Sequence, residues 1–586
     1  MKIGTGILKI VATSALLGGI AVGGTAAAAG LAQVHGNVSP MLTRATVVRH
    51  HSVSAKLNIS IALPLQNQDQ LAQFLHDLHD RSSSSYHKFL KPGEFAQLYG
   101  PSAGQVQAVE DFLTQHGIPA RSISVSPNRT RVMFTATTAA VESAFGVAIN
   151  DYTVDGATFY SASGDPSLPA DLHVKAVFGL DDAVQWKPHN IQNLHPAPRG
   201  RGAGPSGYGP QQIATAYDWP NPNAVVDPLT DTSLASGVTI AIATAFTYRP
   251  LDVQKFWDTY GLPHHTLSNV PINGTTHVLN GETTLDIERS SSMSPGSAIK
   301  VYECSTPANA NFDAEFQAIA TADTEQVVST SWGLNETQSG LASIGAEHDA
   351  FVQMATQGQT VMAAAGDDGS NDRFSGNGGD NADFPSSDPF VIAAGGTTLF
   401  LDNTNFIVEE DAWSGAGGAD SLYFAEPSFQ TSAAGWVSNT NCSEDVTSDS
   451  NYVDDQTGVC TAAGAPSRQS SDISMDADPS TGYSIYYNGR WEVFGGTSFV
   501  APELAGFFAI LAGQDITINS ATGFEGSGPE LVFCAAATNP SGDFHDITSG
   551  SNGNFSAGTG WDHPTGWGSP DAALLAGDLA ASCVVH

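Results

Sequence analysis

Short apolar runs rich in β-branched residues alternate with helical stretches from about residue 210 to the end of the chain. The runs VTIAIAT, AIKVYE, QVVSTSWG, TVMAAAG and PFVIAAGG are largely apolar throughout instead of alternating with polar residues. Between them, ANFDAEFQAIATA and LASIGAEHDAFVQMATQ carry apolar residues at helical spacing. Continuously apolar strands belong to parallel sheets that helices cover on both sides. The pattern therefore predicts an α/β fold with a parallel sheet covered by helices on both faces.

Three polar motifs directly follow predicted strands. They are SWG at 331–333, AAGDDG at 364–369 and GGTS at 495–498. Open parallel sheets bind their ligands at the carboxyl ends of the strands. We therefore expect these three motifs to build the functional site.

A smaller α/β unit precedes this sheet. Within residues 45–188, SAKLNISIALPL alternates as a strand does, and NQDQLAQFLHDLHD has apolar residues at helical spacing. Residues 189–209 are rich in Pro, Gly and Arg without periodicity, which is typical of an exposed linker open to cleavage. The predicted organisation is a small domain over 45–188, this linker, and a large domain over 210–586.

The formal net charge of −37 is concentrated in the second part of the chain. Residues 1–205 hold 15 Lys and Arg against 13 Asp and Glu, whereas residues 206–586 hold 7 against 46. Such an acidic surface repels phosphate, which argues against a nucleic-acid partner. With few basic groups, the chain also has little positive self-repulsion once its carboxylates are protonated. This composition suits acid, although solubility alone would also explain it.

Residues 1–29 have the pattern of a signal peptide. Lys2 and Lys9 precede an apolar stretch rich in Gly and Ala that ends in small residues. A membrane anchor is the alternative, but the glycines and small residues dilute the apolar stretch. We expect a secreted, extracellular protein with no membrane association after signal cleavage.

The five cysteines contain no C-x-x-C pair, which disfavours a zinc site. Cys442 and Cys460 bracket a polar loop, and Cys534 with Cys583 would fasten the C-terminus. We expect these two disulfides, which suit an exported protein, and a buried thiol at Cys304.

Ser498 follows two glycines and a threonine in GGTSFVAP and begins an apolar helical stretch. Glycines allow the backbone to turn sharply, and a helix N-terminus favours developing negative charge. Both features suit a nucleophile, although a serine helix cap has the same local pattern. Gly-Thr-Ser-x-x-x-Pro also resembles the nucleophile motif of the subtilisin superfamily.

The histidine base that a subtilisin would use is missing. After the linker no histidine is followed by Gly-Thr, and the first strand, in VTIAIATAFTYRP, contains no aspartate. LNGETTLDIERS instead places Glu282 and Asp286 four residues apart, on one face of a helix. Two carboxyls that close share a proton, and they can accept a serine proton in acid, where histidine is already charged. An ordinary acidic helix face is the alternative.

Asp367 follows a predicted strand, within the tight turn AAAGDDGSND. A protonated aspartic acid can donate a hydrogen bond to an oxyanion. Asp367 is thus a candidate for stabilising negative charge, with a turn aspartate or a calcium ligand as the alternatives.

Together these motifs resemble the sedolisin family, the serine-carboxyl peptidases that include kumamolisin. Glu282-x-x-x-Asp286, SWG, AAGDDG and GGTSFVAP follow the family's order, as do PSSDPFVIAAGGTTL at 385–399 and RQSSDISMDADPSTGY at 468–483. The N-terminal unit resembles the family's activation domain, above all in SSSSYHKFLKPGEFAQLYGPS. Several motifs in one order are far more specific than any single motif. The resemblance implies a subtilisin-like sheet preceded by an activation prodomain.

The resemblance also implies a role for each candidate. Ser498 corresponds to the nucleophile, Glu282 to the general base and Asp286 to the carboxyl that supports it. Asp367 corresponds to the oxyanion-hole acid, which acts with the backbone N–H of Ser498. One departure is Thr244, which stands about where kumamolisin-like members have a glutamate.

Asp546 and Asp562 flank a glycine-rich loop near the C-terminus. Hard cations bind oxygen, and glycines let backbone carbonyls turn inward. A glycine-rich turn pinned by aspartate caps is the alternative. The segment resembles the sedolisin calcium loop, which implies one Ca²⁺ ion held by the Asp546 and Asp562 side chains and the carbonyls of Ile547, Gly558 and Gly560.

These observations combine into a secreted, acid-active serine-carboxyl endopeptidase made as a self-processing proenzyme. Its partners would be polypeptide substrates and its own prodomain, which assists folding and blocks the cleft of a monomer. Acid would weaken the attraction between the two domains and allow cleavage within 189–209. Three alternatives stay open: a tripeptidyl-peptidase of the same family, a neutral subtilisin-type hydrolase, and an inactive secreted binding protein.

Overall fold

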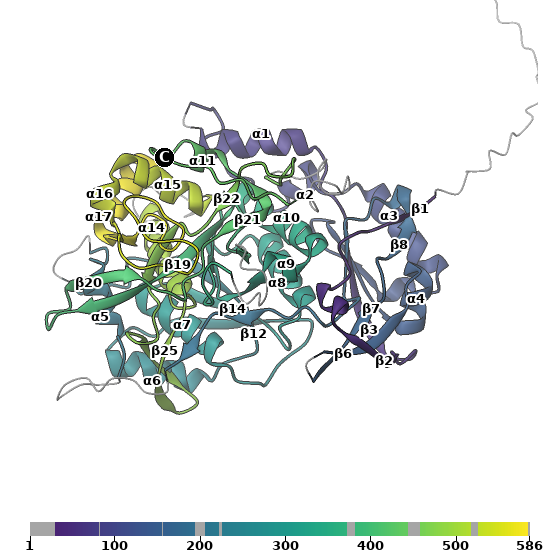
Figure 1. Ribbon diagram of the computed structural model, residues 1–586, viewed down its shortest axis with the longest axis horizontal. Helices are drawn as coiled ribbons and strands as arrows, with labels where there is room; N and C mark the ends of the chain where they lie inside the picture. Colours follow the sequence, from purple (N-terminus) through teal and green to yellow (C-terminus); the bar gives the residue numbers. More distant parts are fainter. Residues whose placement is uncertain are drawn as a thin grey trace, which may run out of the picture.

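The computed structural model describes residues 30–80, 82–154, 156–193, 206–221, 226–371, 381–443, 458–516 and 526–583. They form two α/β units that lie side by side, the smaller one from the N-terminal part of the chain (Figure 1). The predicted signal peptide, 1–29, and most of the predicted linker, 194–205, lie outside the described residues.

The large unit is built on an eight-stranded sheet. Seven strands follow the order β13-β14-β12-β15-β17-β19-β20, and β23 pairs with β19. Every pairing is parallel except that of β19 with β20, which confirms the predicted parallel sheet. In chain order the strands are β12 (Thr239–Ala245), β13 (Thr266–Ile272), β14 (Ala298–Cys304), β15 (Val327–Thr330), β17 (Thr360–Ala364), β19 (Val391–Leu401), β20 (Ile407–Ala412) and β23 (Ile473–Asp476).

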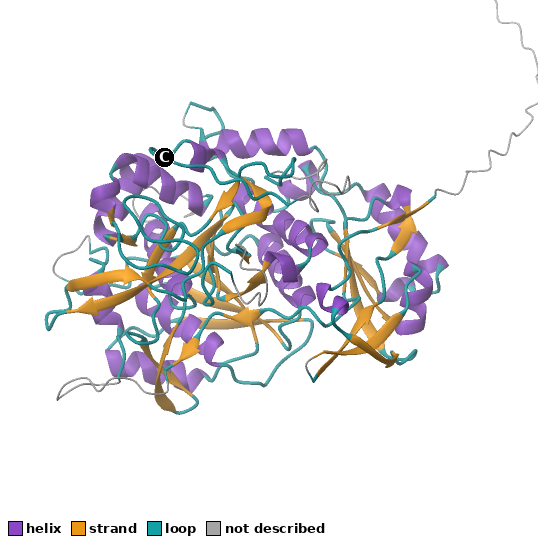
Figure 2. Ribbon diagram, in the orientation of Figure 1, coloured by secondary structure: helices purple, strands orange, loops and turns teal. Residues whose placement is uncertain are grey.

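Helices cover both faces of this sheet (Figure 2). On β12, Ile240 shares a core with Phe507 of helix α14, whereas Ala241 shares a second core with Phe312 of helix α8. Consecutive strand residues point to opposite faces, so a strand buried on both sides must be apolar throughout. The main covering helices are α6 (Pro250–Tyr260), α7 (Gly281–Met293), α8 (Asn309–Ala322), α10 (Leu341–Gln357), α14 (Val500–Gln514), α15 (Gly528–Thr538) and α17 (Ala572–Asp578).

The small unit has two larger antiparallel sheets, a two-stranded antiparallel sheet of β1 (Leu31–Gln33) and β8 (Ser167–Pro169), and its own core. One larger sheet has the order β4-β5-β3-β9 and the other β2-β6-β7. Ile59 and Phe134 of the first sheet pack with Phe112 and Phe145 from two helices. The strands are β2 (Thr46–His50), β3 (Lys56–Ala62), β4 (Ile123–Val125), β5 (Arg131–Thr137), β6 (Ile149–Val154), β7 (Ala157–Ala162) and β9 (Ala176–Phe178), and the helices α1 (Gln68–His79), α2 (Glu94–Leu98), α3 (Ala103–Gln115) and α4 (Thr138–Phe145).

The two units meet through buried ion pairs. The Arg131 guanidinium contacts the Asp313 carboxylate of α8 at 2.6 Å, and both side chains are at most 2% exposed. Lys175 contacts Asp349 of α10 at 2.7 Å, again with both partners buried. In each pair the small unit supplies the cation and the acidic large unit supplies the anion. The excess of acidic residues in the large unit therefore contributes to its pairing with the small unit.

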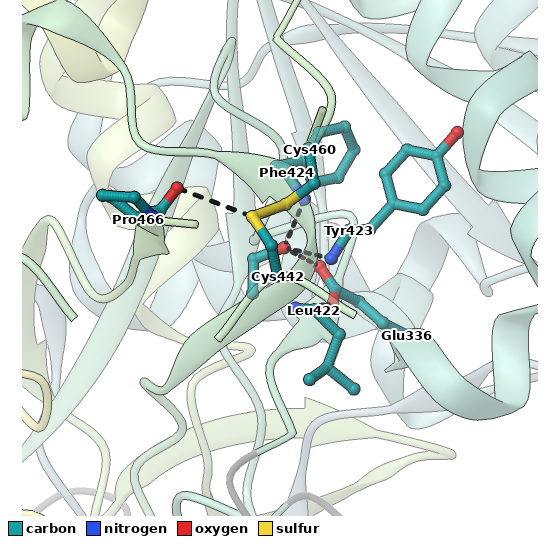
Figure 3. Close-up of a disulfide and its surroundings, with 8 residues drawn as sticks. Glu336, Leu422, Tyr423, Phe424, Cys442, Cys460 and Pro466 are labelled. Atoms are coloured by element: carbon teal, nitrogen blue, oxygen red, sulfur yellow. Dashed lines mark hydrogen bonds between the residues drawn. A yellow bond between two sulfur atoms is a disulfide. The ribbon is translucent and has the colours of Figure 1, made fainter. Parts of the chain in front are cut away.

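Both predicted disulfides are present. Cys442 bonds to Cys460 and Cys534 to Cys583, while Cys304 is a buried free thiol. Figure 3 shows the first disulfide beside strand β21 (Asp420–Ala425), where the Cys460 N–H donates to the Tyr423 carbonyl at 2.9 Å. This disulfide therefore ties the loop after β21 back onto that strand.

Replacing Arg131 by Met should destabilise the full-length chain, because it leaves the Asp313 carboxylate buried without its cation. Breaking a buried pair in this way costs about 3–5 kcal/mol. Urea unfolding of the full chain at pH 7 measures the change.

Arg49→Met is the matched control, because Arg49 pairs with Asp151 but is 76% exposed. An exposed pair contributes at most about 1 kcal/mol. The double variant Arg131→Met/Asp313→Leu should regain much of the lost stability. Equal effects of Arg131→Met and Arg49→Met would contradict the importance of the buried pair.

Candidate active site

Ser498 lies in a tight turn between strand β25 (Arg490–Gly495) and helix α14. Gly496 has a φ of 116°, and a Cβ there would lie 2.2 Å from the His189 carbonyl oxygen and 2.4 Å from Asp367 Oδ2. Only glycine allows the backbone this conformation and this close approach. The turn thus presents the fully buried Ser498 at the N-terminus of α14.

Glu282 and Asp286 both lie on helix α7, in its first and second turns. The Asn280 side chain caps the helix by accepting a hydrogen bond from the Glu282 N–H at 2.7 Å. The Glu282 carboxyl lies close enough to the Ser498 hydroxyl and to Asp286 for both to shift its pKa. The two carboxyls lie on one helix, as their four-residue spacing predicted, and the structure places Ser498 near them.

This carboxyl couple holds its proton far above the usual pH for carboxylic acids. Burial, followed by the charge of Asp286, raises the pKa of Glu282 well above its ordinary value. Burial also raises the pKa of Asp286 to about 8, although the hydrogen bond from Ser331 and the neighbouring Glu282 carboxyl oppose the shift. Because both side chains are fully buried and adjacent, ionising both at once is strongly unfavourable.

Ser331 extends this chain of hydrogen bonds. Its hydroxyl donates to Asp286 Oδ1 at 2.6 Å, and its carbonyl oxygen lies 3.4 Å from the Ser498 hydroxyl. Ser331 stands at the carboxyl end of β15, in the SWG motif. Ser331 thus fixes the Asp286 carboxyl and also lies beside the Ser498 hydroxyl.

Thr244 supports the start of α7 from the end of β12. Its hydroxyl lies 3.1 Å from the Thr283 hydroxyl and accepts a hydrogen bond from the Trp332 indole at 3.0 Å. Thr283 in turn donates to the Ala245 carbonyl at 3.1 Å. A neutral hydroxyl pair therefore links β12 to the residue next to Glu282.

Asp367 faces the same turn from the end of β17. Its Oδ1 accepts hydrogen bonds from the Thr497 N–H at 2.8 Å and from the Thr497 hydroxyl at 3.0 Å. These bonds aim Oδ2 at the space in front of Gly496, where the His189 carbonyl also points. A protonated Asp367 and the Ser498 N–H can therefore act on one oxygen atom.

Residues 187–193, at the end of the small unit and the beginning of the predicted linker, run through this site. The Ser498 N–H donates to the His189 carbonyl at 2.9 Å, and the Asn190 amide donates to Glu282 Oε2. His189 itself is fully buried. The composition of residues 189–209 predicted an exposed linker, but His189 is covered because its backbone binds the active-site strands.

The predicted calcium loop places its two carboxylates around one turn. Asp546 Oδ1 accepts from the Gly560 N–H at 3.0 Å, and Asp562 Oδ2 accepts from the Gly558 N–H at 2.9 Å. Burial raises the pKa of both carboxyls, that of Asp562 to about 6. Among the described residues no group of three or more His, Cys, Asp or Glu side chains could hold a metal. An ion here would thus need main-chain oxygens as well, and the glycines leave room for them.

Local sequence patterns indicated part of this site only. Ser498, Glu282, Asp286 and Asp367 were all candidates, and they meet. Asn190 was not a candidate, and neither were the supporting contacts of Thr497 and Ser331. The SWG motif pointed toward Ser331, whereas no local pattern marks Asn190 as an active-site residue.

Comparisons with known proteins find matches for both units of the chain. Residues 43–183 match the model of the pro-kumamolisin activation domain, and residues 274–554 match that of the subtilase family. Kumamolisin of Bacillus sp. (strain MN-32) is 30% identical over 88% of this chain and 90% of its own. Sedolisin of Pseudomonas sp. (strain 101) is 28% identical over 90% and 88%. Tripeptidyl-peptidase 1 of Rattus norvegicus is 25% identical over 89% and 91%.

A solved structure of Pseudomonas sedolisin, a serine-carboxyl proteinase complexed with pseudo-iodotyrostatin, has a TM-score of 0.51 and 27% identity to this chain. It covers 64% of this chain and 98% of its own. The fold and site thus define a subtilisin-like serine peptidase made with an activation prodomain. More narrowly, the chain belongs to the sedolisin family of serine-carboxyl peptidases.

The raised pKa values predict that the chain is more stable in acid than at neutral pH. Between about pH 4 and pH 8 the folded state keeps the Asp286 proton, whereas the unfolded state loses it. Stability is therefore fully present below about pH 4 and is lost as pH rises to about 8. We expect the midpoint of thermal unfolding to fall by at least about 5 °C over this range.

Asp286→Asn should flatten part of this slope, because the amide cannot titrate. Glu409→Gln is the control, because Glu409 is exposed on β20. Scanning calorimetry across the range compares all three proteins, each carrying Ser498→Ala so that none cleaves itself in acid. A midpoint that rises from pH 4 to pH 8 would exclude the proposed protonation of the folded state.

Proposed function

We propose that this chain is a secreted, acid-active endopeptidase in which Ser498 is the nucleophile and Glu282 the general base. One observation carries the proposal: the Ser498 hydroxyl lies beside a buried carboxyl couple, near enough to shift the pKa of Glu282. A carboxylate can accept the serine proton at a pH where an imidazole would already be charged, so the proposed mechanism requires one carboxyl of the couple to be ionised when substrate is bound. Asp286 keeps Glu282 in place and shares its proton.

In the proposed reaction the Ser498 oxygen attacks the carbonyl carbon of a peptide bond. Its proton passes to Glu282, which then returns a proton to the leaving amine. The Ser498 N–H and a protonated Asp367 stabilise the oxyanion, and water hydrolyses the acyl-enzyme by the reverse steps. This requirement for a protonated Asp367 is a second reason for activity in acid.

The path of residues 185–193 favours endopeptidase over tripeptidyl-peptidase action. The chain continues upstream of His189 through at least four residues, and the Trp186 N–H donates to the Pro307 carbonyl at 2.8 Å. It also continues downstream as the strand Ile191–Gln192. A site that holds a chain on both sides suits cleavage within a polypeptide. Tripeptidyl-peptidase action, found among the named relatives, remains the second candidate.

Acid would also release the small unit. The Asp313 and Asp349 carboxylates face Arg131 and Lys175 across the interface, so the attraction between the two units is partly electrostatic. The small unit would then leave the cleft after the linker is cut. We therefore assign it the roles of folding aid and temporary inhibitor.

We place the mature enzyme outside the cell. Residues 1–29 carry the sequence pattern of a signal peptide, and two disulfides suit an oxidising compartment. No helix in the described part of the chain has the length and apolarity needed to cross a bilayer.

One Ca²⁺ ion is the proposed cofactor of the C-terminal loop. The Asp546 and Asp562 side chains would supply charge, and the carbonyls of Ile547, Gly558 and Gly560 would complete the oxygen ligands. A cation between the exposed Asp546 and the buried Asp562 would stabilise their negative charges. The ion would brace this loop against the active-site domain.

Ser498→Ala and Glu282→Gln should each abolish hydrolysis of a denatured protein substrate. Loss of the nucleophile or its base lowers kcat by at least about 10⁴-fold. Assays at about pH 4 measure the rate, and gel electrophoresis should show that the Ser498→Ala precursor keeps its full size.

Asp367 supplies the matched control. Asp367→Asn keeps a hydrogen-bond donor toward the oxyanion, whereas Asp367→Ala should lower kcat by about 10²–10³-fold. Activity that survives Glu282→Ala would favour the neutral hydrolase. A wild-type chain that never cleaves itself or a substrate in acid would favour the binding protein.

Calcium should bind the full chain and raise its unfolding temperature, and Asp562→Asn should remove both effects. Isothermal titration with Ca²⁺ measures binding, with Mg²⁺ as the ion that prefers a smaller octahedral site. Asp258→Asn is the control, because Asp258 is an exposed acid of α6. Unchanged calcium affinity in Asp562→Asn would place the ion elsewhere.

A further inference from the structure

Residues 187–192 form strand pairs on both sides of one peptide bond. Upstream, β10 (Lys187–Pro188) pairs antiparallel with β16 (Trp332–Asn335) of the SWG motif. Downstream, β11 (Ile191–Gln192) pairs antiparallel with β25, which leads to the nucleophile. Only His189 and Asn190 lie between these two pairings. The backbone is thus held at both ends of the His189–Asn190 bond.

The backbone N–H and carbonyl of His189 hydrogen-bond directly to the backbone of Ser331 and Ser498. The His189 N–H donates to the Ser331 carbonyl at 3.0 Å, and its carbonyl accepts from the Ser498 N–H at 2.9 Å. Asp367 Oδ2 points into the same space in front of Gly496. This carbonyl oxygen therefore stands where an oxyanion would be stabilised.

The side chains fix the same register. The His189 imidazole lies 3.3 Å from Asp383 Oδ1 in strand β18 (Asp383–Phe384), and both side chains are at most 1% exposed. On the other side of the bond, Asn190 donates to Glu282 Oε2. A shift by one residue would break these contacts together, because neighbouring side chains of an extended segment point in opposite directions.

We infer that His189–Asn190 is the first bond that this chain cuts, and that each molecule cuts its own copy. The inference rests on the proposed function, since it makes residues 187–193 the first substrate of that site. It narrows the predicted linker, 189–209, to one bond. It also makes the first cleavage unimolecular, because substrate and catalyst are already in contact.

The chemistry balances within these residues and one water molecule. Ser498 Oγ bonds to the His189 carbonyl carbon while its proton moves to Glu282. The C–N bond to Asn190 then breaks, and Glu282 protonates the Asn190 nitrogen to give a free amine. Water, deprotonated by Glu282, hydrolyses the ester, which leaves a His189 carboxylate and restores the serine hydroxyl.

The test follows self-processing of the full-length chain after a shift from neutral pH to about pH 4. N-terminal sequencing and intact mass of the earliest products should give one new N-terminus at Asn190 and one new C-terminus at His189. The first-order rate constant should be unchanged across a hundredfold dilution. A different first bond, or a rate constant proportional to protein concentration, would overturn the inference.

Two histidine variants separate the bond from the linker as a whole. His189→Asp places a carboxylate against Asp383 and should slow formation of the Asn190 terminus at least tenfold. His195→Asp, six residues further along the linker, should leave it unchanged. The reverse order of effects would move the first cut away from His189.

Ser498→Ala distinguishes failure of the inference from failure of the proposed function. Processing that requires Ser498 but begins at another bond would sink only the assignment of His189–Asn190. Processing of the Ser498→Ala chain at the wild-type rate would sink the proposed nucleophile as well.

Discussion

The site depends on a pair of acids held where water cannot reach them. Glu282 and Asp286 are fully buried on one face of α7, so the couple keeps a proton over a pH range in which free carboxyls are ionised. This couple must stay beside Ser498, which begins a different helix. The buried Arg289 side chain of α7 donates to Glu503 of α14 at 2.8 Å, and so it joins the helix that carries Glu282 to the helix that begins after Ser498. The parallel sheet beneath fixes both helices.

The distribution of charge has a structural reason. Asp313 and Asp349 of the acidic large unit form ion pairs with Arg131 and Lys175 of the small unit, respectively. The same excess of carboxyls leaves the large unit with few cations to repel one another in acid. The same composition therefore suits both the precursor, in which the two units are paired, and the acid-active peptidase that we propose.

The sequence predicted those parts of the structure that depend on periodic patterns of neighbouring residues. Apolar strands and amphipathic helices defined the sheet, and the four-residue spacing of Glu282 and Asp286 placed them on one face. It could not predict contacts between distant segments. Asn190 binds Glu282 although 92 residues separate them in the sequence. The residues around Asn190 are polar and aperiodic, so the sequence gave no sign that Asn190 lies beside Glu282. The backbone of residues 187–193 is ordered by strand pairing, which does not depend on side-chain periodicity.

The pairing of β11 with β25 does not depend on the His189–Asn190 bond, so cleavage of that bond leaves the pairing in place. Once the chain is severed, Ile191 and Gln192 are still joined to the strand before Ser498, and a fresh ammonium group lies next to Glu282. The nascent end is thus a tethered competitor at high effective concentration. Cleavage of the His189–Asn190 bond and opening of the active site are therefore two separate events. The active site opens only when β11 dissociates from β25.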